Sequence, residues 1–428
     1  MTIDTTITHI DGLRVWDSRG RPTVEAIVRL ACGAEGRAIA PAGASTGSGE
    51  AVDLRDGGTA FGGFDVQNAV GAVNGDIAQA LRGLDAADQT GVDQCMIGLD
   101  GTDNKGRLGG NATIAVSMAV VQAAARAHDQ PLWRYLGGSE SSHLYLPEIQ
   151  IFGGGAHANR RIDIQDFMVV AVGAESYVQA LEWTAEVYIA AGKVMDERGT
   201  LMGLADEGGY WPAFDGNADG LDLLTQAIER AGFVPGEQMA IALDVAATEF
   251  CENGRYRLAL EDRELDTDAM CAMMVDWVER YPICSLEDPL SEDDGPGLIK
   301  LTAAIGEHVQ IVGDDYLATN AARVRQGAAD GACNSVLVKP NQAGTLTETK
   351  AAFDASRDAG WTAIISGRSG ETEDATICHL AVAWGVPQLK VGSFARSERM
   401  VKWNEGLRIA HQIGNAGPLV PRSRFPWA

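Results

Sequence analysis

Three acidic residues come directly after short apolar runs in the second half of the chain. Asp244 closes the run 239–243, and Glu287 and Asp314 stand in the same position in later runs. Carboxylate oxygens are the ligands that Mg²⁺ prefers, with water or substrate oxygens in its remaining positions. Each acid could instead cap the helix that follows it, as Asp often does. Because the pattern recurs three times, it favours a metal site over three separate caps.

Two lysines end similar runs. Lys339 follows the run 335–338, and Lys390 lies within the run 388–391. A lysine beside a metal ion and a second cation should have a lowered pKa and could remove a proton from carbon. The alternative is a structural ion pair between each lysine and a nearby carboxylate. Because the three acidic residues occupy similar positions at the ends of neighbouring runs, a catalytic role for Lys339 is favoured.

Further polar residues suggest an anion site and a proton-transfer site. Arg368 and Ser369 lie between glycines after the apolar run 362–365. This pattern is typical of a phosphate or phosphonate site, although exposed turns contain many such pairs. Asp166 and Glu207 offer a carboxyl pair for proton transfer to a leaving hydroxyl, but their spacing alone does not decide the matter.

The elements that must position these residues are short buried strands that alternate with helical patterns. Runs of four to six β-prone residues predict parallel strands covered on both faces. Their alternation with helices predicts a closed (β/α) barrel, whose chemistry sits at the carboxyl ends of the strands. A chain of 428 residues can hold a barrel of roughly 250 residues and a second domain.

The first part of the chain has a different pattern. Residues 7–16 and 23–31 alternate as strands do, with a Gly- and Pro-containing turn between them. Asn111 is the predicted N-cap of a helix over 112–128, which is apolar on nearly every face and should be buried. The segment 38–49 has few bulky side chains, so it is either a linker or a loop that closes over a ligand.

Composition limits the partners and the compartment. A net charge of −25 argues against nucleic acid and anionic membranes as partners. No apolar run approaches the ~20 residues of a membrane span, and the first residues lack the pattern of a signal peptide. The seven cysteines are scattered without a C-x-x-C pair, and the seven histidines show no zinc-ligand spacing. We therefore expect a cytoplasmic protein with reduced thiols.

The chain resembles the enolases over essentially its whole length. The motifs that carry the resemblance lie in fixed order along the chain and are highly specific for the family, though not for one activity. They are residues 17–25 (DSRGRPTVE), 43–47 (GASTG), 54–57 (LRDG), 99–105 (LDGTDNK), 206–209 (DEGG), 287–289 (EDP), 339–342 (KPNQ), 368–374 (RSGETED) and 396–399 (RSER).

The resemblance implies an α+β capping domain over residues 1–137 and a modified (β/α)₈ TIM-type barrel over residues 138–428. It implies a homo-oligomer, a dimer or an octamer. It also implies one high-affinity Mg²⁺ and a second Mg²⁺ that arrives with the substrate. The substrate would be a small phosphorylated or phosphonylated carboxylate of the 2-phosphoglycerate or phosphoenolpyruvate type, processed through an enolate intermediate. Enzymes of the enolase superfamily use a Lys or His base with Mg²⁺ for such chemistry.

The resemblance also assigns a role to each matching residue. The high-affinity metal would be held by Asp244, Glu287 and Asp314, and Ser45 would help to bind the second ion and the substrate. The substrate phosphate would be held by Arg368 and Ser369, beside Gly367. Catalysis would fall to Lys339 as the base, Lys390 at the substrate carboxylate, Glu207 as the acid with Asp166 beside it, and His157 closing over the site.

Four positions depart from the family pattern. Gly367 stands where a histidine is expected, and Asp166 stands where a glutamate is usual. Pro340 replaces a valine, and Gly153 alters the usual Asn-Gly-Gly. The metal ligands and both lysines are kept while the side of the leaving hydroxyl is rebuilt. This contrast suggests a specialised lyase paralogue similar to the carboxyphosphonoenolpyruvate synthases of phosphonate-antibiotic pathways. The alternatives are an ordinary enolase and a non-catalytic enolase-like binding protein.

Overall fold

The first part of the chain forms a three-stranded antiparallel sheet. Its strands are β1 (Ile7–Trp16), β2 (Pro22–Leu30) and β3 (Glu35–Ile39), in the spatial order β1-β2-β3. The computed structural model describes residues 3–44, 47–138, 143–414 and 416–428. Both predicted strands are confirmed, the second beginning and ending one residue earlier than expected.

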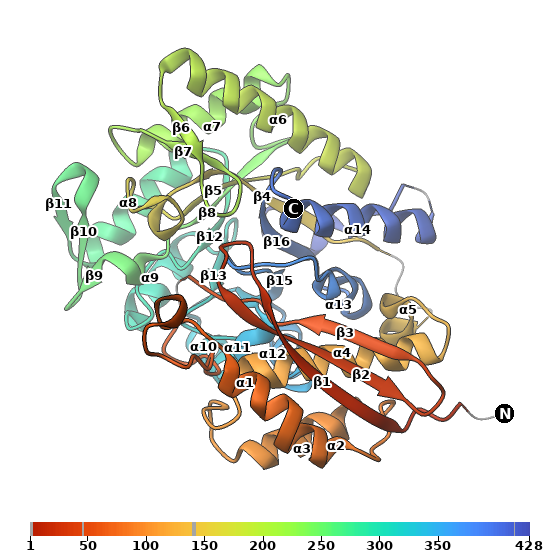
Figure 1. Ribbon diagram of the computed structural model, residues 1–428. Helices are drawn as coiled ribbons and strands as arrows, with labels where there is room; N and C mark the ends of the chain where they lie inside the picture. Colours follow the sequence, from red (N-terminus) through yellow and green to blue (C-terminus); the bar gives the residue numbers. More distant parts are fainter. Residues whose placement is uncertain (1–2, 45–46, 139–142, 415) are drawn as a thin grey trace.

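Helices cover this sheet on one side (Figure 1). Those that pack on the sheet are α1 (Gln67–Ala72), α2 (Ala78–Leu81) and α4 (Gly110–Ala127), while α3 (Gln89–Asp100) and α5 (Leu132–Gly137) pack against α4. The central helix α4 packs against β2 and β3 and is buried along most of its length, as predicted. The N-cap prediction is wrong, because Gly109 precedes the helix and Asn111 lies in its first turn. The Asn111 side chain instead donates to Asp53 Oδ1 (2.9 Å) and to the Leu54 carbonyl (3.1 Å).

Eight strands of the second part close into a barrel, because the last strand pairs with the first. In chain order the strands are β4 (Leu146–Gly153), β5 (Asp166–Val170), β8 (Ala240–Asp244), β12 (Ile283–Glu287), β13 (Gln310–Gly313), β14 (Ser335–Val338), β15 (Thr362–Ser366) and β16 (Gln388–Ser393). The barrel is modified at β5, which runs antiparallel to β4 and β8, whereas the other neighbouring strands of the barrel are parallel. The connection between β4 and β5 contains only the short 3₁₀ turn Gly155–Ala158, and a parallel pair needs a longer crossover.

Helices surround the barrel (Figure 1). They are α6 (Tyr177–Arg198), α7 (Ala218–Arg230), α8 (Thr267–Arg280), α9 (Gly295–Ile305), α10 (Ala321–Asp330), α11 (Pro340–Ala343), α12 (Leu346–Asp358), α13 (Thr376–Trp384) and α14 (Ser397–Ile413). The short strands β6 (Leu201–Leu204), β7 (Tyr210–Pro212), β9 (Cys251–Glu252), β10 (Arg255–Leu258) and β11 (Arg263–Leu265) lie outside the closed barrel. The first residue of α11 is Pro340, a position where a missing backbone donor is tolerated.

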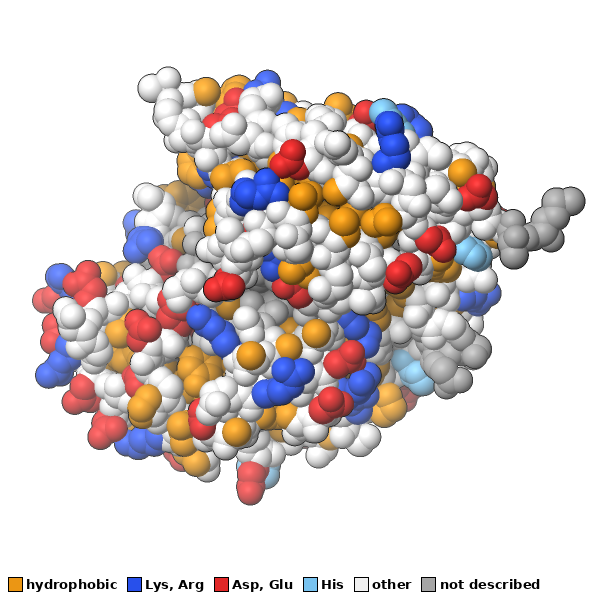
Figure 2. Space-filling model, turned by 90° about the horizontal axis from the view of Figure 1, so that it is seen from below, with side chains coloured by type: hydrophobic (Ala, Val, Ile, Leu, Met, Phe, Trp, Pro, Cys, Tyr) orange, Lys and Arg blue, Asp and Glu red, His pale blue; other side chains and the backbone are white. Residues whose placement is uncertain are grey.

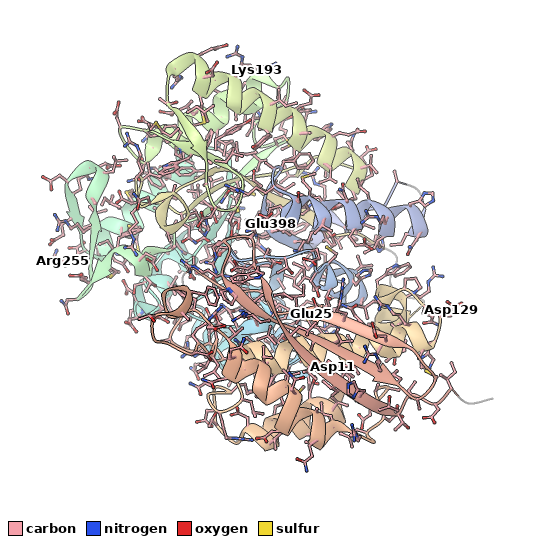
Figure 3. All side chains as sticks on the ribbon, in the orientation of Figure 1. Asp11, Glu25, Asp129, Lys193, Arg255 and Glu398 are labelled. Atoms are coloured by element: carbon pink, nitrogen blue, oxygen red, sulfur yellow. The ribbon has the colours of Figure 1, made fainter. Side chains whose placement is uncertain are left out.

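The surface carries charged residues of both signs. Figure 2 shows acidic and basic side chains interspersed with hydrophobic ones on one face of the molecule. In Figure 3, Lys193 on α6 and Arg255 on β10 lie at the outer edge of the molecule. None of the helices in the described ranges combines the length and apolar character that a membrane crossing needs. All seven cysteines are free thiols.

Candidate active site

The three predicted metal ligands lie at the carboxyl ends of three adjacent barrel strands. Asp244 ends β8, Glu287 ends β12, and Asp314 follows β13; β12 pairs with both neighbours, and Glu287 is level with Asp244. All three are buried. None of them caps a helix: the caps of α8 and α9 are Asp266 and Asp294. The strand register thus brings the three carboxyl groups to one end of the barrel, where their charges need cationic partners.

Both lysines form ion pairs with these carboxylates. Lys390 Nζ lies 2.8 Å from Asp244 Oδ2 and 2.8 Å from Glu287 Oε2. Lys339 Nζ donates a hydrogen bond to Asp314 Oδ2. The ion-pair alternative raised by the sequence is therefore what the structure contains, and it joins the two lysines to the same three acids.

The carboxylates that touch the two lysines raise the lysine pKa values, and the predicted lowering beside a metal ion stays a prediction. Burial alone would lower the pKa of Lys339, but the charge of Asp314 outweighs it and holds that pKa above its ordinary value. The pKa of Lys390 is likewise raised, because Asp244 and Glu287 outweigh its burial. Both amines are charged while these contacts persist. The sequence could not show this, because the sign depends on which carboxylate touches each amine.

The donor set fits a hard divalent cation. All three side chains offer carboxylate oxygens, the ligand type that Mg²⁺ prefers. Glu287 Oε1 is fully buried and has no hydrogen-bond partner among the residues that the structure describes. A buried carboxylate oxygen without a donor is costly, and a bound cation would satisfy it. Mg²⁺ held by Asp244, Glu287 and Asp314 is therefore compatible with the chemistry of the residues present.

A histidine between two carboxylates forms the opposite side of the site. His157, in the turn after β4, places Nδ1 3.1 Å from Asp166 Oδ1 and Nε2 3.8 Å from Glu207 Oε1. Although burial opposes it, the charges of Asp166 and Glu207 raise the pKa of His157 to about 9. Burial would also raise the pKa of Asp166, but His157 lowers it to about 2. The imidazolium is therefore charged at neutral pH and holds a proton beside Glu207.

The predicted anion site follows β15, and a second arginine fixes its backbone. Arg399 is fully buried, and its guanidinium donates to the carbonyls of Arg368 and Ser369, both at 2.6 Å. The Arg368 guanidinium forms a two-pronged ion pair with Glu50, with NH1 2.9 Å from Oε2 and NH2 3.2 Å from Oε1. The backbone of this loop is thus fixed by one arginine while a carboxylate already engages the other.

The space beside Gly367, where the family has a histidine, is occupied by the Glu371 side chain. A Cβ atom added there would lie 2.9 Å from Glu371 Oε1, closer than an ordinary contact. The Glu371 carboxylate is itself held by Lys402, 2.7 Å away, and accepts from the Arg368 amide. Any side chain at residue 367 would therefore have to displace a paired carboxylate. The close approach of Glu371 gives a physical reason for glycine at this position.

The structure brings nearly all of the predicted site residues around one narrow cleft, whose volume is about 20 Å³. Its lining includes His157, Asp166, Glu207, Asp244, Lys339, Gly367, Arg368, Ser369 and Lys390. The two remaining acids, Glu287 and Asp314, bond to Lys390 and Lys339 at its base. The position of Ser45 lies outside the described residues. The role assigned to each residue stays a prediction.

Sequence reasoning missed several neutral and acidic partners. Gln150 donates to Asp166, Gln165 donates to Asp244 (3.1 Å), and Gln342 donates to Asp314 (2.9 Å). Glu50, the partner of Arg368, was also missed. Gln342 and Gln165 each stand within a few residues of a predicted site residue, which is a usable signal. Gln150 and Glu50 carry none, because only the fold brings them to the cleft.

A barrel with carboxylates and lysines at the carboxyl ends of its strands, covered by a smaller α+β domain, defines a class of barrel enzymes. Comparison with family models specifies the class. The model of the enolase N-terminal domain matches residues 7–136, and the model of the enolase C-terminal TIM barrel domain matches residues 141–424. The chain belongs to the enolase family, and it is an enzyme of the enolase superfamily with a capping domain and a TIM barrel.

Proposed function

We propose that this protein is a Mg²⁺-dependent lyase-type enzyme that acts on a phosphorylated or phosphonylated three-carbon acid through an enolate. The observation that carries the proposal is the convergence of Asp244, Glu287 and Asp314 with Lys339 and Lys390 at one end of the barrel. Three buried acids and two buried lysines are too costly to gather for packing alone. A shared cation site beside a base gives them a common purpose.

In this proposal the three carboxylates hold Mg²⁺, whose charge offsets the negative charge that develops on the substrate carboxylate when the proton leaves. Lys339 and Lys390 now donate to one oxygen of each of these carboxylates. A bound cation would compete with these ion pairs. Lys339 would act as the base once it gives up the Asp314 contact that raises its pKa, and Lys390 would turn to the substrate carboxylate.

The opposite side of the cleft supplies the proton for the leaving group. Glu207 faces the cleft and lies 3.8 Å from His157 Nε2, whose pKa is raised to about 9. The charged His157 imidazolium therefore lies beside the proposed acid. Arg368 and Ser369 bind the phosphate or phosphonate oxygens, and a second Mg²⁺ arrives with them, assisted by Ser45.

The substrate proposed is that of a specialised paralogue such as carboxyphosphonoenolpyruvate synthase in phosphonate antibiotic biosynthesis. Gly367 and Asp166 support it, because one lies beside the proposed phosphate ligands and the other beside His157 on the side of the leaving group, while the metal ligands and both lysines are kept. Ordinary enolase activity, the dehydration of 2-phosphoglycerate to phosphoenolpyruvate, is the alternative outcome of the test below. A non-catalytic binding protein is disfavoured, because it would have no need for the three acids and two lysines.

Phosphorus NMR of the purified protein with Mg²⁺ tests the proposal. One sample contains 2-phosphoglycerate, and the other contains phosphoenolpyruvate with a nucleotide-activated phosphonoformate. Turnover in the second sample alone supports the paralogue, and turnover in the first at about 1–10³ s⁻¹ identifies an ordinary enolase activity. Turnover in neither sample contradicts the proposed function. The proposal also includes a cytoplasmic location, in keeping with the seven free thiols, and a homo-oligomeric state, a dimer or an octamer.

A further inference from the structure

The Arg368 guanidinium, the predicted anion ligand, is already paired with the Glu50 carboxylate. The two side chains are 318 residues apart in sequence, and both are at least nine-tenths buried, with exposed fractions of 3% for Arg368 and 8% for Glu50. A two-pronged arginine–carboxylate pair is among the stronger contacts in proteins, especially away from water. Asn341 Oδ1 accepts a further bond from the same NH1 at 3.2 Å. The charge of the predicted anion ligand is thus largely offset within the protein.

Glu50 also has neighbours that link it to the metal side. Its Oε1 accepts from the Gly47 amide at 3.0 Å and from Gln342 Nε2 at 3.3 Å. Gln342 Nε2 donates as well to Asp314 Oδ1 at 2.9 Å. One carboxylate therefore touches the segment that follows Ser45, the anion-binding arginine, and a side chain that contacts a predicted metal ligand.

We propose that Glu50 is a specificity-determining residue that limits how tightly the site binds the oxyanion of its substrate. The inference rests on the proposed function, because it takes Arg368 as the oxyanion ligand. A phosphate bound to Arg368 lies close to the Glu50 carboxylate, and like charges in a site shielded from water repel strongly. Glu50 weakens the binding of a dianion more than that of a monoanion, since the repulsion scales with the charge on the ligand.

The test compares Glu50→Gln with Glu292→Gln. A glutamine at residue 50 keeps an oxygen for Gly47 and Gln342 and removes the charge. Glu292 is a matched control, because it is a glutamate that accepts from the same segment, from both the amide (3.2 Å) and the hydroxyl (3.0 Å) of Ser48. The ligands are methyl phosphate, nearly a dianion at pH 8, and dimethyl phosphate, a monoanion. Their dissociation constants are measured by phosphorus NMR with Mg²⁺ present.

In Glu50→Gln we expect methyl phosphate to bind about tenfold more tightly and dimethyl phosphate about threefold more tightly, because the lost repulsion scales with ligand charge. Glu292→Gln should leave both constants within about twofold of the wild type, as changes at surface contacts usually do. A folded Glu50→Gln protein that binds methyl phosphate no more tightly than the wild type overturns the inference. An equal gain in Glu292→Gln also overturns it.

Glu50→Gln leaves a buried arginine without its carboxylate and could fail to fold. In that case Glu50→Asp decides, since it keeps the charge but withdraws it by one methylene. It should bind methyl phosphate about two- to fivefold more tightly, a smaller gain of the same sign, and no gain overturns the inference.

A kinetic readout separates this role from a structural one. The KM of Glu50→Gln for the phosphorylated substrate should fall about tenfold without a rise in kcat, because both ground state and products bind more tightly. If the wild type turns over neither substrate mixture, the proposed function fails. The anion titrations still decide the role of Glu50, so the two failures are distinguishable.

Discussion

The barrel interior contains two polar layers, one at each end of its strands, and they differ in charge. At the amino ends of β13 to β16 the layer is built of neutral side chains, with the buried Glu148 as an acidic neighbour 3.3 Å from Gln388 Nε2. Gln310 Nε2 donates to Thr362 Oγ1 (2.7 Å), Gln388 Oε1 (2.8 Å) and Ser335 Oγ (3.0 Å). Two residues further along β13, β14 and β15 the side chains are apolar, and they form a small cluster of Val312, Leu337 and Ile364, whereas β16 already carries Lys390 at that position. Beyond this cluster the next inward positions carry Asp314 and Lys339.

The difference between the layers separates stability from function. The amino-end layer pairs mostly neutral groups with each other, so it has little charge to neutralise, and the atom that it leaves unpartnered in the described part of the chain, Gln310 Oε1, is a neutral amide oxygen. The carboxyl-end layer gathers charges that burial disfavours, and it leaves Glu287 Oε1 without a partner in the described part of the chain. Such a layer gains little in stability over apolar packing. Its residues are explained by what they could bind.

The largest expected effect that tests this difference between the layers is the loss of kcat in Lys339→Met. If the carboxyl-end layer is catalytic, losing the proposed base should lower kcat by about 10²–10⁴-fold. The measurement is the steady-state rate on whichever substrate mixture the wild type turns over, with circular dichroism to confirm folding. The control is Lys193→Met, on the exposed face of α6, which should retain wild-type rates. A folded Lys339→Met enzyme within tenfold of the wild type would contradict the assignment.

The converse substitution is Gln310→Met in the amino-end layer. It removes the donor shared by three acceptors, so the free energy of unfolding should fall by about 1–3 kcal/mol. Chemical denaturation measures the loss. Turnover of the folded protein should stay within about threefold of the wild type, because Gln310 does not line the cleft. A loss of activity comparable to that of Lys339→Met would erase the distinction between the layers.

A smaller expected effect is the pH dependence of the free energy of unfolding that His157 contributes. The pKa of His157 is raised in the folded protein to about 9, so its contribution to stability is complete below about pH 6.5 and is lost as pH rises through about 9. Between these values the free energy of unfolding should decline by up to about 1.4 kcal/mol per pH unit on its account. Denaturation of the wild type and of His157→Gln from pH 6 to 10 measures it.

The difference between the two proteins isolates His157 from other groups that titrate in this range. Burial and the neighbouring Asp314 charge raise the pKa of Asp315 to about 8, and this carboxyl is present in both proteins. The wild-type curve should therefore be steeper than the curve of the variant. Parallel curves would show that His157 is not held charged between Asp166 and Glu207.

The sequence was sufficient for the elements that have a strong local signal. The strand over residues 7–16 ends where its pattern predicted, and the helix predicted over 112–128 is α4 (Gly110–Ala127). The candidate site was also within reach, because residues at the ends of consecutive strands must meet at one end of a barrel. Asp244, Glu287 and Lys390 were found in this way, and the ion pairs between them agree with it.

Other features depend on contacts through space and could not be predicted. The reversed direction of β5 was missed, because an apolar run looks the same in either direction. The raised pKa of Lys339 follows from its contact with Asp314 rather than from any motif. Glu50 was missed because its partner Arg368 is 318 residues away and only the packing of the first part of the chain against the barrel joins them.

Calorimetric titration with Mg²⁺ tests the central claim most directly, since that claim is a divalent cation held by Asp244, Glu287 and Asp314. The wild type should bind one Mg²⁺ without substrate, and Glu287→Gln should weaken this binding by at least about 100-fold, as loss of a charged ligand does. Glu148→Gln is the matched control: Glu148 is an equally buried glutamate in β4, level with Lys390, and this variant should bind Mg²⁺ as the wild type does. Equal Mg²⁺ binding by the wild type and Glu287→Gln, or none by the wild type, would contradict the account.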